Sequence, residues 1–253
     1  MTPAPPPKRA STHSRSPHGF RLARCRPCRR LSRGGGDYRD AFREGTGTYA
    51  EQELGERAFI AGHSMPLRDF IDAFTTNDGG TGGEFAGGGV TGYMAQHDFL
   101  GQVPEASAAC SPTPPYVGCE DAAGDAMKTA MRRVWLGPAG TVTPLHRDPY
   151  HNLLCQVWGS KLVYLYKAED EARVYPFPNG FLRNTSRVDA ESPDIDRYPL
   201  FKSASRWEVI LGPGEMLFMP AKTWHYVRAT GDSCSLSVSY WWGRARRSVE
   251  ETP

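Results

Sequence analysis

The second half of the chain consists of short apolar segments in which β-branched and aromatic residues predominate. These segments span residues 133–136, 153–158, 161–166, 207–211, 216–219 and 235–242. Gly, Pro or Ser separates several of them, as tight turns require. Many short strands joined by tight turns are typical of an antiparallel sandwich or barrel. The pattern therefore predicts a mainly β fold.

The first half of the chain shows much less periodicity. Residues 65–74 (MPLRDFIDAF) place four apolar side chains at helical spacing, which predicts one amphipathic helix. Residues 77–89 are dominated by Gly and predict an exposed loop. We therefore expect a flanking region at 37–126, with a few helices, and a β core at 127–245.

The two ends of the chain differ from the rest in composition. Residues 1–36 are rich in Pro, Arg, Ser and Gly, which predicts a disordered basic tail. Residues 246–253 form a second, short tail. An Arg- and Ser-rich segment without acids also resembles an organelle transit peptide. A wrongly predicted gene start is a third interpretation of residues 1–36.

Composition and charge exclude several classes of function. No stretch reaches the apolar length of a membrane-spanning helix, so we expect no membrane partner. Nine of the 30 Lys and Arg lie in residues 1–36, which leaves 21 against 28 acidic residues and a net charge of −7 for the remainder. A core with this balance is not expected to bind nucleic acid directly. The six cysteines form no dense framework, which favours a reducing compartment.

The residues with the clearest chemistry are two histidines and an aspartate. His146 and Asp148 are two residues apart in TVTPLHRDPYHN, so on an extended segment they point the same way. GEMLFMPAKTWH supplies His225 at the start of another β segment. Two His and one carboxylate form the facial triad that leaves positions open on Fe(II). An HxD triplet alone is more often a chance pattern, and a lone His more often a core residue. The turn after a predicted strand and the G-x5-P-x4-H spacing favour iron.

Lys161 begins the alternating segment KLVYLY. An inward Lys in a barrel is costly unless it meets an anion, and the C5 carboxylate of 2-oxoglutarate is such an anion. Tyr93, Thr143 and Asn152 could add hydrogen bonds. By position alone, a Lys at the end of a strand and exposed to water is the simpler interpretation.

Three motifs carry a resemblance to a known family. HRDPYHN, NTSRVD and SYWW, with the segments around them, resemble the small JmjC-domain Fe(II)- and 2-oxoglutarate-dependent oxygenases. The similarity is to the branch of lysine demethylase 8, which is also regarded as a protein arginyl hydroxylase. The resemblance implies a double-stranded β-helix, the jelly-roll barrel of cupins.

The same resemblance implies roles for individual residues. The iron ligands are those proposed above, Lys161 pairs with 2-oxoglutarate, and the residues beside the cosubstrate are Tyr93, Thr143, Asn152 and Trp135. The residues that line the substrate cleft are Glu44, Tyr49, Gln96 and Trp241. An acid with aromatic walls suits a guanidinium or ammonium group. A polar surface loop is the alternative interpretation of the segment that contains Glu44 and Tyr49.

Three functions follow from this resemblance. Hydroxylation of a protein side chain, in particular arginine, comes first, with a protein or peptide such as a histone or ribosomal protein as substrate and dioxygen as oxidant. Demethylation of methylated histone lysine is the second, and a silent chromatin-binding or scaffold module is the third. We expect a monomer in the nucleus or cytoplasm, or in an organelle if residues 1–36 are a transit peptide.

Overall fold

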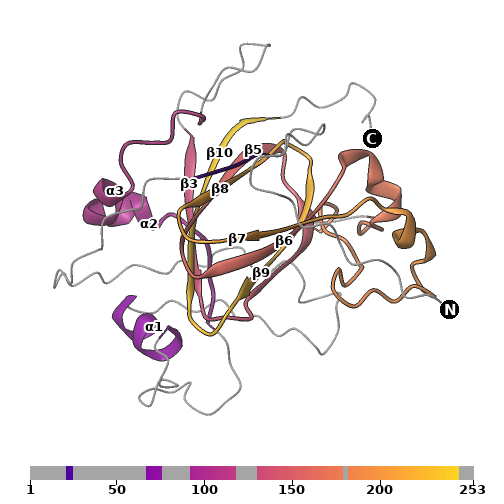
Figure 1. The fold of residues 1–253 in the computed structure, drawn as a ribbon, viewed down its shortest axis with the longest axis horizontal. Helices are drawn as coiled ribbons and strands as arrows, with labels where there is room; N and C mark the ends of the chain where they lie inside the picture. The colour runs from indigo at the N-terminus through magenta and orange to yellow at the C-terminus, as the bar shows by residue number, and fades with distance from the viewer. Residues whose placement is uncertain (1–20, 25–66, 76–91, 118–129, 179–181, 245–253) are drawn as a thin grey trace.

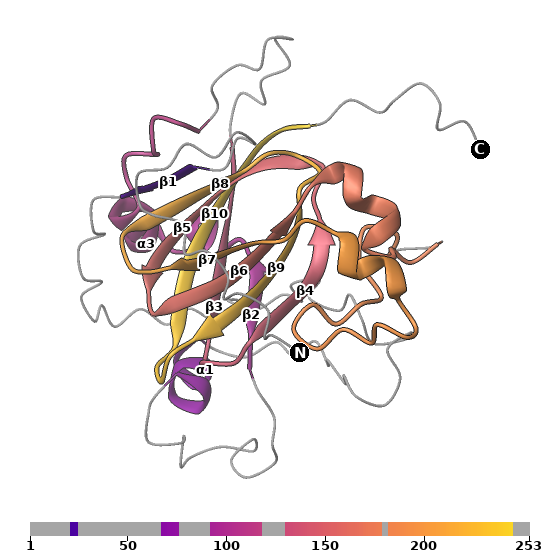
Figure 2. The same cartoon turned by 45° about the vertical axis from the view of Figure 1, so that its right-hand side comes forward.

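Two antiparallel β-sheets form the body of the molecule (Figures 1 and 2). The computed structural model describes residues 21–24, 67–75, 92–117, 130–178 and 182–244. In these ranges, no helix is long and apolar enough to span a membrane. The elements outside the sheets are α1 (Leu67–Phe74), α2 (Phe99–Gln102), α3 (Pro104–Ala109) and the two 3-10 helices η1 (Ala168–Arg173) and η2 (Pro199–Ser203).

The larger sheet, sheet A, has the strand order β1-β8-β5-β10-β3-β2. Its strands are β1 (Arg21–Arg24), β2 (Met94–His97), β3 (Met131–Gly137), β5 (Tyr150–Trp158), β8 (Glu215–Met219) and β10 (Ser235–Arg244). The central strand β10 pairs with both β3 and β5. Strands far apart in sequence therefore become neighbours, as closure into a jelly roll requires.

The smaller sheet, sheet B, has the strand order β4-β9-β6-β7. Its strands are β4 (Val142–Arg147), β6 (Ser160–Tyr166), β7 (Trp207–Leu211) and β9 (Trp224–Thr230). The pairing of β4 with β9 sets His146 directly opposite His225. Residues opposite each other in an antiparallel pair project from the same face, so this pairing brings two candidate ligands together.

The two sheets pack face to face over a shared interior. Sheet A contributes Leu154, Leu217 and Met219, and sheet B contributes Val163 and Leu165, among other members of one buried cluster. Successive side chains of a strand point to opposite faces, so β5 of sheet A and β6 of sheet B each send alternate residues inward. Burial of this apolar surface is the main term that holds the two sheets together.

The outer faces of the two sheets are covered differently. On sheet A, a cluster that includes Phe70 of α1, Leu100 of α2 and Ala106 of α3 packs against residues of β3, β5 and β10. On sheet B, the connection between β6 and β7 folds over an aromatic cluster that includes Tyr166 and Trp224. Figure 2 shows η1, η2 and this connection together at one side of the barrel.

The prediction of a mainly β fold with a few flanking helices is confirmed. Each segment predicted as a strand is one, with bounds extended by up to three residues, and the helix predicted at 65–74 is α1. The sequence did not predict α2 or α3, and α3 begins at Pro104 in a short Ala-rich stretch. Pro suits the first turn of a helix because its missing N–H has no partner there.

One expectation for the N-terminal tail is wrong in part. Residues 1–36 were predicted to be disordered, but Arg21–Arg24 forms β1 and pairs with β8. The unpaired edge of β8 offers backbone donors and acceptors that a passing chain can satisfy, and composition does not reveal that opportunity. The rest of this tail, residues 246–253 and the predicted loop at 77–89 lie outside the described residues, and the division into domains stays a prediction.

Candidate metal centre and cosubstrate pocket

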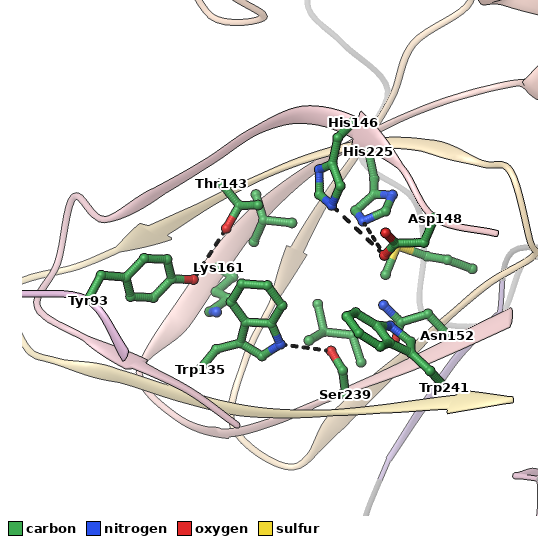
Figure 3. Close-up of a pocket in the computed structure, with 13 residues that line it drawn as sticks. Tyr93, Trp135, Thr143, His146, Asp148, Asn152, Lys161, His225, Ser239 and Trp241 are labelled. Atoms are coloured by element: carbon green, nitrogen blue, oxygen red, sulfur yellow. Dashed lines mark hydrogen bonds and ion pairs between the residues drawn. The ribbon is translucent and has the colours of Figure 1, made fainter. Parts of the chain in front are cut away.

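Three side chains from two neighbouring strands converge at one end of the barrel interior. His146 is the last residue but one of β4, Asp148 directly follows that strand, and His225 is the second residue of β9. Their candidate ligand atoms lie within 4.8 Å of one another. The two imidazole rings are 4.2 Å apart between centroids, and Figure 3 shows both turned toward the carboxylate.

Hydrogen bonds on the far side of each ring define which nitrogen is free. Nδ1 of His146 lies 2.8 Å from the carbonyl oxygen of Pro144, and Nδ1 of His225 lies 3.0 Å from that of Thr223. A carbonyl can only accept, so each Nδ1 carries the hydrogen and each Nε2 presents a lone pair. This orientation by a backbone carbonyl is the usual arrangement of metal-binding histidines.

The Nε2 atoms of both rings face the carboxylate of Asp148. Oδ2 of Asp148 lies 3.9 Å from Nε2 of His146 and 3.8 Å from Nε2 of His225. Burial, followed by the nearby His146, lowers the pKa of His225 to about 4, so at neutral pH that contact is not an ion pair. The carboxylate oxygen is buried and has no hydrogen-bond partner among the described residues. Lone pairs that converge in this way fit a divalent cation.

Lys161 lies in the same interior, on β6. Its side chain is 2% exposed, and Nζ lies 5.9 Å from the ring centroids of both Tyr93 and Trp135. Burial lowers the pKa of Lys161 to about 7. No carboxylate in the described part of the chain forms an ion pair with it. An amine buried among aromatic rings without a counter-ion fits an anionic ligand better than it fits structural packing.

Two neighbours of Lys161 offer hydrogen bonds to such an anion. The hydroxyls of Tyr93 and Thr143 lie 3.3 Å apart. Burial raises the pKa of Tyr93 to about 12, against a smaller opposing effect of the Thr143 hydrogen bond. The phenol therefore stays protonated and can donate. Figure 3 shows this pair and Lys161 on the opposite side of the pocket from the two histidines.

Comparison with known protein families covers the part of the chain that contains this pocket. A family model described as a cupin-like domain matches residues 29–248. The chain belongs to the cupin-like JmjC domain family. Lysine-specific demethylase 8 of Xenopus tropicalis is 44% identical over 151 residues, which cover 60% of this chain and 33% of that protein.

Two further relatives are similar to this chain to the same degree. Jumonji C domain-containing protein 5 of Drosophila melanogaster is 44% identical over 150 residues, covering 59% of this chain and 36% of the relative. Lysine-specific demethylase 8 of Danio rerio is 41% identical over 178 residues, covering 70% and 40%. The chain thus matches 33% to 40% of the length of these curated relatives.

In this JmjC chain, one pocket collects all eight residues that the sequence assigned to metal and cosubstrate. The pocket is lined by Tyr93, Trp135, Thr143, His146, Asp148, Asn152, Leu154, Lys161, Met219, His225, Val227, Ser239 and Trp241. Sequence reasoning missed Ser239, whose hydroxyl accepts a hydrogen bond of 3.1 Å from Nε1 of Trp135. The two-residue spacing of Ser239 and Trp241 on β10 is the signal that could have found it.

Of the four residues predicted to line the substrate cleft, one lines the pocket, one lies outside it, and two are not among the described residues. Trp241 lines the pocket and stacks on Tyr150, with 6.2 Å between ring centroids and 16° between planes. Gln96 is half-buried in β2, at a bulge in the pairing with β3, and has a φ of 58°. It does not line the pocket. Glu44 and Tyr49 lie outside the described residues.

Three polar groups of the pocket are buried without partners among the described residues. They are Oδ2 of Asp148, Oδ1 of Asn152 and Nε1 of Trp241. Buried polar atoms in folded proteins are nearly always hydrogen-bonded, so their grouping around one pocket indicates a polar ligand. Together with Lys161, these groups offer donors and acceptors on several sides of a small anion.

Proposed function

We propose that this protein is an Fe(II)- and 2-oxoglutarate-dependent oxygenase. One observation carries the proposal: the ligand set of His146, Asp148 and His225 shares a single pocket with the amine of Lys161, which has no ion-pair partner among the described residues. Iron, when bound with 2-oxoglutarate, would supply the activation of dioxygen. The overall reaction converts 2-oxoglutarate, dioxygen and a C–H bond into succinate, carbon dioxide and a C–OH group.

The protein residues bind and orient the reactants. Lys161 pairs with the distal carboxylate of 2-oxoglutarate, and Tyr93 and Thr143 donate hydrogen bonds to it. Asn152 and Trp135 bound the cosubstrate on the remaining sides. Asp148 acts as a ligand and not as a general base, because its free oxygen faces both imidazoles.

The proposed substrate is a side chain of a protein, such as a histone or ribosomal protein, in the nucleus or cytoplasm. The stacked pair of Trp241 and Tyr150 forms an aromatic wall suited to a guanidinium or ammonium group. Gln96 is proposed to lie beside it, with Glu44 and Tyr49 as the acid and tyrosine of the cleft. We propose arginyl hydroxylation as the primary reaction.

Demethylation of methyl-lysine is the second candidate. It is favoured by the names of two of the relatives, lysine-specific demethylase 8 of Xenopus tropicalis and of Danio rerio. Both reactions begin with hydroxylation of a C–H bond in a cationic side chain, and in demethylation that bond belongs to an N-methyl group. They differ in the product, because a hydroxylated N-methyl group leaves as formaldehyde.

The test is turnover of 2-oxoglutarate to succinate by the full chain with Fe(II) and ascorbate. Peptide pools containing arginine, lysine or methyl-lysine are compared, with His146→Ala as the inactive control. We expect turnover that requires His146 and rises most with an arginine peptide that gains one oxygen atom by mass spectrometry. Formaldehyde release would favour demethylation instead. A folded protein that binds neither iron nor 2-oxoglutarate would contradict the oxygenase and leave the scaffold function.

A further inference from the structure

Arg147, the residue between the two ligands of the HxD triplet, contacts groups on the outer face of sheet B. Its guanidinium donates two hydrogen bonds to the carboxylate of Glu171 in η1, of 2.8 and 2.6 Å. It also lies over the ring of Trp224, 5.1 Å from the centroid. Trp224 is the cross-strand partner of Arg147 and directly precedes His225. Arg147 therefore links the strand of His146 to the strand of His225 from behind.

The backbone of the same residue is held by a second segment. The amide of Arg147 donates to the carbonyl of Asn184 at 2.9 Å, and Nδ2 of Asn184 donates to the carbonyl of Arg147 at 3.1 Å. Asn184 thus binds both polar backbone atoms of the residue between the ligands. The next residue, Thr185, forms a β-bridge with His146. Asn184 begins the NTSRVD motif, and the proposed chemistry gives that motif no role.

These contacts distinguish the ligand end of β4 from an ordinary sheet edge. β4 has β9 on one side, and the 184–186 segment lies along its other side, where the amide of Ser186 donates to the carbonyl of Leu145 at 2.7 Å. Backbone carbonyls hold the two histidine rings, but Oδ2 of Asp148 has no hydrogen-bond partner among the described residues, so the position of this carboxylate depends on the backbone that carries it. Outer partners that orient metal ligands commonly change metal affinity about 10- to 100-fold when removed.

We propose that Arg147, Glu171 and Asn184 are positioning residues that set the geometry of the iron ligands from the outer face of the sheet. The proposal rests on the proposed function, since it takes the triad to be a metal site. Arg147 fixes the register of the two ligand strands through Glu171 and Trp224. Asn184 fixes the peptide that joins His146 to Asp148.

The same sheet offers a matched control pair. Arg228 of β9 donates from Nε to both carboxylate oxygens of Glu191, at 2.9 and 3.0 Å. Its side chain is 33% exposed, against 23% for Arg147, and Glu191 is 31% exposed, against 47% for Glu171. Both pairs join sheet B to the β6–β7 connection. Arg228 pairs with Val142 and Leu162, away from the triad.

The experiment measures binding of Co(II) to the full chain by calorimetry, with visible absorption as a report on ligand geometry. Arg147→Gln, Glu171→Gln and Asn184→Ala are compared with Arg228→Gln and Glu191→Gln, all at a temperature where circular dichroism shows each variant folded. We expect the first three to raise the Kd for Co(II) about 10- to 100-fold and to shift the absorption bands. The double variant Arg147→Gln/Glu171→Gln should bind Co(II) no more weakly than the weaker-binding of the two single variants, because both changes remove the same Arg147–Glu171 ion pair.

Three outcomes would overturn the proposal. Unchanged Co(II) affinity in the first three variants contradicts a positioning role. An equal loss in the Arg228 and Glu191 variants assigns the effect to general stability of the sheet. Failure of the wild-type chain to bind Co(II) refutes the metal site itself, and this outcome differs from the first, in which the wild type binds normally.

Discussion

Two regions of one interior differ in how completely their atoms are satisfied. Between the middles of the sheets, the cluster around Leu217 and Val163 packs apolar side chains that are 8% exposed or less. Further along the same strands, the pocket contains a buried amine and several polar atoms without partners among the described residues. β6 supplies both regions, since Lys161, Val163 and Leu165 alternate with its outward side chains.

The difference shows that one part of the barrel interior stabilises the fold and another part is suited to bind ligands. Burial of apolar side chains contributes to folding whether or not a ligand is present. A buried amine and free carboxylate oxygen cost stability until ligands meet them. The apolar region therefore offsets a pocket that is unfavourable when empty, and changes in the two regions should affect different measurements.

Leu217→Ala is expected to have the largest effect, and on stability alone. Leu217 is 1% exposed and does not line the pocket. Removing a buried Leu side chain costs about 3 kcal/mol through lost burial and a cavity. The free energy of unfolding, measured with urea, should fall by that amount while the affinity for 2-oxoglutarate stays within twofold at a temperature where the variant is folded. Ile210→Ala, at a position 57% exposed, is the control and should cost less than about 0.5 kcal/mol.

Lys161→Met should affect stability and binding in opposite directions. Loss of a desolvated charge partner weakens binding of an anion by about 100-fold, or about 2.8 kcal/mol. The same change removes a buried amine and should raise the unfolding temperature of the free protein. Calorimetry with 2-oxoglutarate and thermal unfolding check the two effects. A variant that binds 2-oxoglutarate as tightly as the wild type would show that Lys161 does not face the cosubstrate.

The affinity for 2-oxoglutarate should fall by up to tenfold for each pH unit above 7. Burial lowers the pKa of Lys161 to about 7 in the free protein, whereas a bound carboxylate favours the ammonium and raises that pKa. Binding above pH 7 therefore takes up a proton. Calorimetry in buffers of different ionisation enthalpy measures this uptake, which Lys161→Met should abolish.

The same pKa makes the stability of the free protein depend on pH. The folded-state pKa lies below the ordinary value of 10.5, so the unfolded chain binds more protons between about pH 7 and 10.5. The contribution of Lys161 to the free energy of unfolding thus rises with pH across that window. A contribution that falls with pH, seen as the difference between wild type and Lys161→Met, would contradict the burial of this amine.

Lys222→Gly is expected to have the smallest effect, at the ligand end of the barrel. Lys222 has a φ of 67° in the turn between β8 and β9, and its amide donates to the carbonyl of Asp148 at 2.8 Å. The left-handed conformation costs an L residue about 1–2 kcal/mol, which Gly avoids. The greater conformational freedom of Gly in the unfolded chain offsets about 0.5–1 kcal/mol of that gain in stability. Urea unfolding should show a gain of about 0.5 kcal/mol, which Lys222→Ala should not reproduce.

Periodicity found the strands that are apolar on their inward face and missed those interrupted by polar residues. β6, β7 and β8 follow the predicted segments. β4 contains Pro144 and His146, and a register irregularity between Thr143 and His146 breaks the alternation. A strand that contributes metal ligands and a bulge has few of the signals on which strand prediction relies.

The sequence motifs predicted the residues of the pocket, but they did not predict the outer contacts of the strands that carry those residues. All eight residues assigned to iron and cosubstrate line one cavity. The contacts of Arg147 with Glu171 and of Asn184 with the backbone join residues 24 and 37 positions apart. No local pattern relates such residues, because the β6–β7 connection that carries Glu171 and Asn184 folds back over sheet B.

The sequence by itself determined the class of the fold and identified the residues that carry the proposed chemistry. The identities of His146, Asp148, His225 and Lys161 follow from motifs, and the alternation of the core strands follows from the two-residue period of a β-strand. The tertiary structure decided which of these groups remain without partners among the described residues. Whether an amine is buried beside an acid or alone depends on strands that pair across the barrel, and that pairing is set by the packing of the whole interior.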